Sequence, residues 1–183
     1  MKGLVFTTFY DFVERRHGPD LLDDVIAESG VPDDGAYTSV GTYPFQDMVA
    51  LVSATAKLTS TPLPALLEAF GEHCFQCWVG MTPEHFDGKD VFDVLASIDQ
   101  FHEGEVRKLY PDAELPSFQV ESRDATTLSL RYFSCKPLAD LATGVIKGAS
   151  RHLNDPVSIS HQAIADAERP YVQFIISRQG TLR

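Results

Sequence analysis

His102 is the residue of this chain whose type and position most directly suggest chemistry. It lies in SIDQFHEGEVRKLYPDAELP (97–116), where an apolar helical pattern gives way to charged residues. Leu95, Ile98 and His102 follow one another at helical steps, which predicts that His102 projects from the buried face of its helix. The residues predicted for that face are Phe92, Leu95, Ile98, Phe101 and Leu109. Because a buried imidazole needs a hydrogen-bond partner or a metal, His102 is a candidate metal ligand or base, or a structural histidine.

A Cys-x-x-Cys motif, Cys74 to Cys77, is the second candidate. A zinc site would need further ligands at a workable spacing, and the chain offers only Cys135 and scattered histidines. A thioredoxin-like motif would follow a strand, whereas this one lies deep in a helical run. We therefore expect Cys74 and Cys77 to line the core or a pocket, with a thiol redox role as the alternative.

Other catalytic patterns are missing from the sequence. There is no Gly-x-Ser-x-Gly motif and no glycine-rich loop that fits a nucleotide-binding fingerprint. The acidic runs Asp23-Asp24 and Asp33-Asp34 fit a solvated helix face and a turn. We therefore expect that the protein is not an enzyme.

The overall composition restricts the partners. The chain has 183 residues and a formal net charge of -11, and this acidic balance disfavours nucleic acid and anionic lipid. Three cysteines in a chain of this size favour a reducing compartment, and neither a signal peptide nor a membrane-spanning stretch is visible. We expect one cytoplasmic domain over residues 1–183, which binds neither nucleic acid nor membrane.

The elements that must position these residues change in type along the chain. Helical periodicity dominates as far as 111, and alternation of apolar and polar residues begins at 117. The predicted helices are 5–18, 18–30, 45–60, 60–81, 88–111 and 136–153, of which 88–111 is either one helix or two joined at Gly104. The predicted strands lie in the hairpin 117–134 and at 157–164 and 169–177. In helix 45–60 the residues predicted to face inward are Met48, Val49, Leu51, Val52 and Leu58. This order predicts an α+β fold, with N-terminal helices packed on a C-terminal antiparallel sheet that has its own helix.

Several segments in one order carry a family resemblance. These are MKGLVF (1–6), YTSVGTYP (37–44), LEAFG (67–71), His102 with EVRKLYPDAELP, and the Tyr-x-Ser-x-Lys that follows the first hairpin. Together with LADLATGVIKGASRHLNDPVSISH after them, they resemble the stand-alone bacterial H-NOX domain. This is the haem nitric oxide/oxygen binding domain of bacterial gas sensors and soluble guanylate cyclases. The resemblance covers essentially the whole chain and implies the H-NOX fold.

The resemblance implies a bound haem b. His102 takes the place of the family's axial iron ligand. Tyr132, Ser134 and Lys136 match the motif that holds the haem propionates, except that the family has arginine where this chain has Lys136. Lysine keeps the charge but lacks the planar fork of arginine. Pro116 matches the proline that presses on the porphyrin edge.

The resemblance also indicates which gas is bound. Members that hold oxygen have a tyrosine whose hydroxyl stabilises it, and the corresponding residue here is Leu141. By the same alignment, the remaining residues of the apolar distal wall are Val5, Phe9, Cys74, Trp78 and Val145. We therefore expect a nitric oxide sensor that rejects oxygen, with carbon monoxide as an open further ligand. The zinc site of some relatives is not expected, since no cysteine accompanies His161.

Signalling would pass to a separate protein. In the family, nitric oxide weakens the iron–histidine bond, and the helical part then shifts against the sheet. A histidine kinase or a diguanylate cyclase/phosphodiesterase is the partner that the resemblance implies. Two rivals stay open, a haem-free interaction domain and a thiol redox sensor that uses Cys74 and Cys77.

Overall fold

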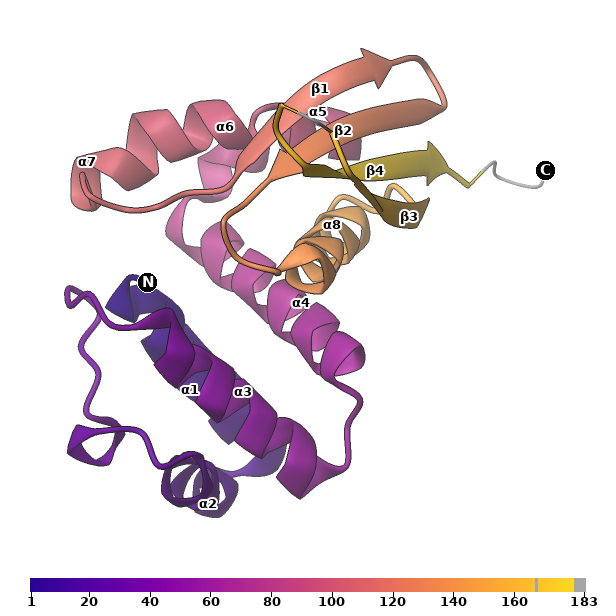
Figure 1. Cartoon of the computed structure of the whole chain (residues 1–183). Coiled ribbons are helices and arrows are strands. Elements are labelled where there is room, and N and C mark those ends of the chain that lie inside the picture. Colours follow the sequence, from indigo (N-terminus) through magenta and orange to yellow (C-terminus); the bar gives the residue numbers. More distant parts are fainter. Residues whose placement is uncertain (167, 180–183) are drawn as a thin grey trace.

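Helices come first and strands last in the computed structural model, which describes residues 1–166 and 168–179. After the N-terminal helices the order is β-β-α-β-β, and the four strands form one antiparallel sheet in the order β1-β2-β4-β3 (Figure 1). The predicted α+β class is therefore confirmed. Within the described residues no helix is long and apolar enough to cross a membrane.

The bounds of the elements follow the predicted ranges closely. The helices are α1 (Gly3–His17), α2 (Pro19–Ser29), α3 (Phe45–Thr59), α4 (Leu63–Met81), α5 (Val91–Ala96), α6 (Ile98–Phe101), α7 (Arg107–Leu109) and α8 (Ala139–His152), with short turns η1 (Asp33–Gly35), η2 (Pro83–Phe86) and η3 (His102–Val106). The strands are β1 (Ser117–Arg123), β2 (Thr127–Phe133), β3 (Val157–Ile164) and β4 (Tyr171–Arg178).

The helices α1, α2 and α3 form a core of their own with the first half of α4. The fully buried residues of this core include Phe6, Phe9, Val25 and Leu51. In α3 the inward prediction is confirmed for Met48, Leu51 and Val52, but it was wrong for Leu58, which is 39% exposed. Val49 is 47% exposed, but it lines a cavity between the N-terminal helices and the sheet. Leu58 lies in the last turn of α3, beyond the reach of the core.

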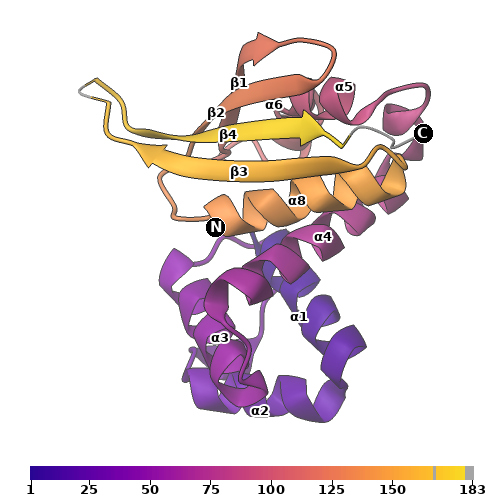
Figure 2. The same ribbon diagram turned by 90° about the vertical axis from the view of Figure 1, so that its right-hand side faces the viewer.

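The second core lies between the sheet and the helices α4, α5 and α8. The strand β2 contributes Leu128 and Leu130, which are fully buried, and it pairs with β1 on one side and β4 on the other. The helix α8 covers one face of the sheet (Figure 2). It buries Ile146 and Ala149, because its apolar residues recur at helical spacing on one stripe.

The helix α4 belongs to both cores. Its first half gives Leu66 and Phe70 to the N-terminal core, and its second half gives Phe75 to the core under the sheet. Figure 1 shows α4 between the N-terminal helices and the sheet. The backbones of α4 and α8 cross closely, since a Cβ added to Gly144 would lie 2.0 Å from the carbonyl oxygen of Glu68.

The segment that carries His102 is a nearly continuous helix with an irregular middle. Asp90 begins it with a capping box, since its side chain accepts from the backbone N–H of Asp93 and the reverse bond is also present. At η3 the helix widens into a π-helical turn that starts at His102 itself. Such turns are rare and often mark functional sites. The inward prediction was wrong for Leu109, which is 77% exposed where the helix ends.

Candidate functional site

Two adjoining cavities lie between the N-terminal helices and the sheet. The larger has a volume of about 550 Å³ and the smaller about 270 Å³. The two cavities are neighbours, since four residues line both: Cys74, Pro116, Tyr132 and Leu141. A large apolar volume with few polar groups is typical of a site for a small molecule or cofactor.

His102 lies on the wall of the smaller cavity. Its Nδ1 is 3.2 Å from the carbonyl oxygen of Pro116. Because a carbonyl can only accept, Nδ1 carries the proton, and Nε2 is left with a free electron pair. Burial lowers the pKa of His102, although the bond to Pro116 opposes this, so the neutral imidazole is favoured. A neutral imidazole with one bonded nitrogen is the usual form of a metal-ligating histidine.

Asp99 fixes the segment that holds this histidine, and the sequence did not reveal this role. Its two carboxylate oxygens accept from the hydroxyl of Ser117 at 2.7 Å and from the backbone N–H of Phe118 at 2.6 Å. The start of β1 is therefore tied to the helix one turn before His102, and Pro116 is held beside the imidazole. Asp99 could have been found only by knowing that β1 returns to this helix.

A charged group of residues borders the larger cavity. Ser134 and Lys136 line it together with Tyr132, so the structure brings the three residues of the Tyr-x-Ser-x-Lys motif to one wall. The Nζ of Lys136 lies 2.6 Å from a carboxylate oxygen of Glu114 and lowers the pKa of that carboxyl. Only 11% of the Lys136 side chain is exposed, whereas Glu114 is 71% exposed. Lys136 is therefore shielded beside the cavity, whereas its partner Glu114 faces solvent.

The rest of the wall is apolar. Val5 lines the larger cavity, Trp78 and Val145 line the smaller one, and Leu141 lines both. The indole nitrogen of Trp78 is fully buried and has no hydrogen-bond partner among the described residues. Since this nitrogen has no accessible surface, the indole presents carbon atoms to the cavity. Phe9 does not line either cavity, because it is completely buried behind Phe70, with the two rings 5.0 Å apart.

The two cysteines of the Cys-x-x-Cys motif have different surroundings. Cys74 lines both cavities, and burial raises the pKa of its thiol well above the usual range. Cys77 instead lies 3.6 Å from the Nε2 of His73. A thiol that resists ionisation is a poor nucleophile, so the surroundings of Cys74 do not favour the redox alternative.

His161 of β3 lies 3.2 Å from the hydroxyl of Thr143 and 3.8 Å from a carboxylate oxygen of Asp140. Its neighbours are therefore a hydroxyl and a distant carboxylate. The expectation that no zinc binds at the C-terminal sheet stays a prediction.

The residues of the two cavities suit a flat apolar group that has a metal at its centre and an acidic edge. An imidazole offers a free electron pair, the surrounding wall is apolar, and a lysine stands at one end. Haem has this combination of properties.

Comparison with known proteins also points to haem. The family model described as "Haem-NO-binding" matches residues 2–161. The unliganded Fe(II) H-NOX protein from K. algicida is 34% identical and superposes with a TM-score of 0.88, over 100% of this chain and 99% of that chain. An H-NOX protein from S. oneidensis in the Fe(II)NO ligation state is 25% identical, with a TM-score of 0.86 over 98% of this chain and 100% of that chain.

Proposed function

Because the chain belongs to the haem-NO-binding (H-NOX) family, whose domains bind haem without catalysing a reaction, we propose that it is a nitric oxide sensor that signals to a separate protein. The observation that carries the proposal is the environment of His102. Its Nδ1–H is bonded to Pro116, and its Nε2 electron pair is free beside an apolar cavity. When bound, the haem supplies a ferrous iron that takes a diatomic gas as a ligand.

His102 would hold the iron through Nε2. The bond to the Pro116 carbonyl orients the ring and raises its basicity, as the second hydrogen bond of a ligating histidine usually does. Pro116 therefore has two tasks, since it lines both cavities and also positions the ligand. Asp99 would support both tasks by fixing the chain directly after Pro116.

Lys136 would bind the acidic edge of the haem together with Tyr132 and Ser134. Its present partner, Glu114, is exposed, and exposed ion pairs contribute little free energy. A haem propionate would therefore replace this carboxylate at little cost in free energy. An ammonium offers a point charge rather than the two parallel donors of arginine. We infer that the propionates are held by charge more than by directed bonds.

The wall opposes oxygen because it offers no strong donor to a gas ligand. Leu141 and Val145 have no polar side-chain atoms, and the nitrogen of Trp78 is buried away from the cavity. Among the residues that align with the family's distal wall, Cys74 is the remaining one with a polar side-chain atom, and a thiol is a weak donor. Nitric oxide depends less on such a donor, so we infer that the site binds nitric oxide, with carbon monoxide as a second candidate.

The signal would leave through the N-terminal helices. A change at His102 can reach them because α4 lines both cavities through Cys74 and belongs to both cores. The gas can shift the equilibrium between two conformations of the protein only by as much as its affinities for them differ. By resemblance to the family, the receiving protein is a histidine kinase or a diguanylate cyclase/phosphodiesterase.

The test is the absorption spectrum of the reduced, haem-loaded protein before and after nitric oxide and before and after air. We expect a five-coordinate ferrous spectrum that changes with nitric oxide and is insensitive to air. The absence of a Soret band after haem is supplied would contradict the proposal and favour the haem-free interaction domain.

A second measurement addresses the thiol redox sensor. Signalling to the partner should depend on haem and should survive substitution of Cys77 by serine. If haem-free protein signals while Cys74→Ala and Cys77→Ser do not, the thiol alternative replaces the gas sensor.

A further inference from the structure

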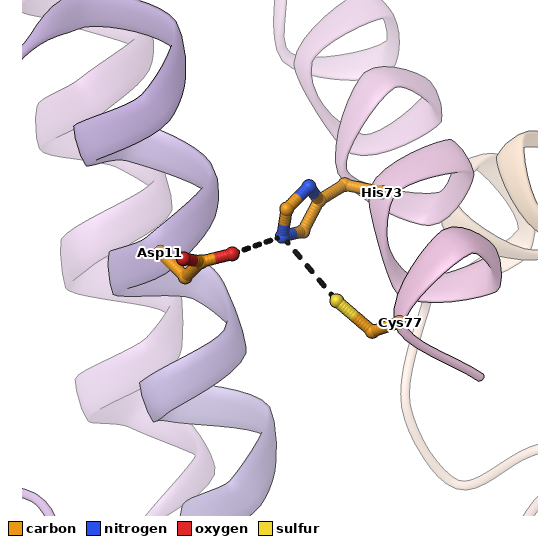
Figure 3. A group of neighbouring side chains, drawn as sticks. All are labelled: Asp11, His73 and Cys77. Carbon is orange, nitrogen blue, oxygen red and sulfur yellow. Dashed lines mark hydrogen bonds and ion pairs between the residues drawn. The ribbon is translucent and has the colours of Figure 1, made fainter. Parts of the chain in front are cut away.

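Asp11, His73 and Cys77 form a cluster between α1 and α4, and none of the three lines either cavity. One possible ligand atom from each residue lies within 4.8 Å of the other two. The Nε2 of His73 is 2.9 Å from Oδ2 of Asp11 and 3.6 Å from the sulfur of Cys77. Figure 3 shows both contacts meeting at the same ring nitrogen.

We propose that Asp11, His73 and Cys77 bind a divalent metal ion of the zinc type. Thiolate, imidazole and carboxylate are the three side-chain ligands that zinc uses in proteins, and three protein ligands leave a fourth position for water or another molecule. The thiolate and the imidazole disfavour magnesium and calcium, which prefer oxygen ligands.

The backbone places the ligands without requiring a large movement. His73 and Cys77 are four residues apart on α4, so they lie on one face, one turn from each other. Tetrahedral zinc with ordinary bond lengths requires about 3.4 Å between its nitrogen and oxygen ligands and about 3.6 Å between nitrogen and sulfur. The nitrogen–sulfur distance of 3.6 Å already fits, and Asp11 would have to withdraw by roughly half an ångström.

Asp11 also has the support expected of a ligating carboxylate. Its Oδ1 accepts from the Nε of Arg15 at 2.8 Å, so the guanidinium orients the carboxylate and leaves Oδ2 toward His73. The His73 side chain is 12% exposed, so the site is shielded but open to an ion from solvent.

Metal binding would change the protonation of two of the ligands. Burial lowers the pKa of His73, although Asp11 opposes the effect, so the ring is neutral at pH 7. Burial also raises the pKa of Cys77, so its thiol keeps its proton until a metal binds. Binding would release that proton to solvent, and the proton on Nε2 would move to the other ring nitrogen through water.

A bound ion would join two helices that belong to different parts of the chain. Asp11 lies on α1 and the other two ligands lie on α4 (Figure 3). Cys74, which lines both cavities, lies on α4 between His73 and Cys77 in sequence. The site itself does not depend on the gas-sensing proposal, because none of its three residues lines a cavity.

The test uses the haem-loaded full chain, freed of metal with a chelator and titrated with ZnCl₂ in a calorimeter. We expect one tight site per chain. X-ray absorption at the zinc edge should show one sulfur ligand at about 2.3 Å and at least one imidazole at about 2.0 Å. Loss of an outer-shell partner alone costs about 10–100-fold in metal affinity, so Cys77→Ser and His73→Gln should each cost at least about 100-fold.

Two further variants distinguish a metal site from a hydrogen-bonded cluster. Asp11→Asn keeps a side-chain oxygen that His73 can donate to but removes the charge, so it should weaken zinc without loss of folding. Cys135→Ser removes an exposed thiol elsewhere and should bind zinc as the original chain does. The haem spectrum reports folding in every variant.

The proposal is overturned if zinc does not bind at micromolar concentration. It is also overturned if Cys77→Ser and His73→Gln bind zinc as tightly as the original chain, or if the zinc edge shows no sulfur.

Discussion

The asymmetry of the His102 ring is the decisive feature at the scale of single residues. One nitrogen is committed to the backbone of Pro116, which leaves a single direction in which a metal can be held. A π-helical turn begins at His102, and such turns often mark functional sites.

Replacement of His102 by glycine should remove the axial ligand and leave space for a substitute. We expect the reduced variant to lose the five-coordinate histidine-ligated spectrum and to recover it when free imidazole is added. Absorption spectroscopy with and without imidazole measures this. His85→Gln is the control, since His85 is half-buried but lines neither cavity. An unchanged spectrum of His102→Gly would show that His102 is not the axial ligand of the iron.

Substitution of Leu141 by tyrosine should add the donor that the wall lacks. A hydrogen bond to a charged acceptor contributes about 1.5–3 kcal/mol, so oxygen affinity should rise roughly 10- to 150-fold. Spectra recorded at graded oxygen pressures measure the affinity. Leu141→Phe fills similar space without a hydroxyl and should show no such gain. Equal gains in both variants would mean that packing, rather than hydrogen bonding, sets the oxygen affinity.

The sequence could predict some of these residues and not others. His102 and the Tyr132 motif stand in segments that resemble a known family, and the structure places them on adjoining walls. The contact of Asp11 with His73 joins residues 62 positions apart, on different helices. Helical periodicity can indicate that His73 and Cys77 share a face, but it cannot show which helix packs there.

At the scale of elements, the crossing of α4 and α8 is a close backbone contact that depends on two glycines. An added Cβ would lie 2.1 Å from the Leu141 carbonyl oxygen at Gly71 and 2.0 Å from that of Glu68 at Gly144. The ion pairs Lys147–Glu68 and Arg151–Glu72 join the same two helices. Positions 71 and 144 must therefore be glycine for the two backbones to approach this closely.

Gly144→Ala should separate the two helices and destabilise the fold. Overpacking of this kind costs about 1–3 kcal/mol of the free energy of unfolding, and here the obstacle is rigid backbone. Gly80→Ala is the control, because an added Cβ there meets nothing within 4 Å, and it should stabilise by about 0.4–1 kcal/mol. Urea unfolding followed by circular dichroism measures both. Equal stability of the two variants would contradict the close backbone contact at Gly144.

Element types and boundaries were largely predictable, since helical and alternating patterns separate cleanly at 117. Burial at helix ends was not. Leu58 and Leu109 keep the apolar spacing of their helices, but each lies in the last turn of its helix and is 39% and 77% exposed, respectively. The alternative of two helices joined at Gly104 placed a break within η3, but the sequence did not indicate that this join would be a π-helical turn.

At the scale of the whole molecule, two hydrophobic cores share one helix. The first lies among α1, α2 and α3, and the second lies under the sheet, while α4 contributes to both. That residues 1–183 form a single domain is a prediction. Sharing of α4 supports it, because neither core is complete when that helix is removed.

Leu51→Ala, in the core of the N-terminal helices, should destabilise both halves together. Leu51 is fully buried, and its truncation should lower the free energy of unfolding by about 2–5 kcal/mol. Hydrogen exchange should show the same loss of protection in α1 and in β2. Leu109→Ala changes an exposed side chain and should stay within about 0.5 kcal/mol. If only the N-terminal helices lose protection, the chain unfolds as two units.

The bare backbone contact of Gly71 with α8 also has a mechanical consequence. Because the two backbones touch at this point, a tilt of α4 would pivot there, and the ion pairs of Glu68 and Glu72 with α8 would have to follow it. Met81 lies ten residues from Gly71, about 15 Å along the helix axis. A tilt of about 4° would therefore move that end by about 1 Å, while the pivot itself stays almost still. A small displacement of α4 beside the cavities would thus become a larger displacement at the ends of the helix.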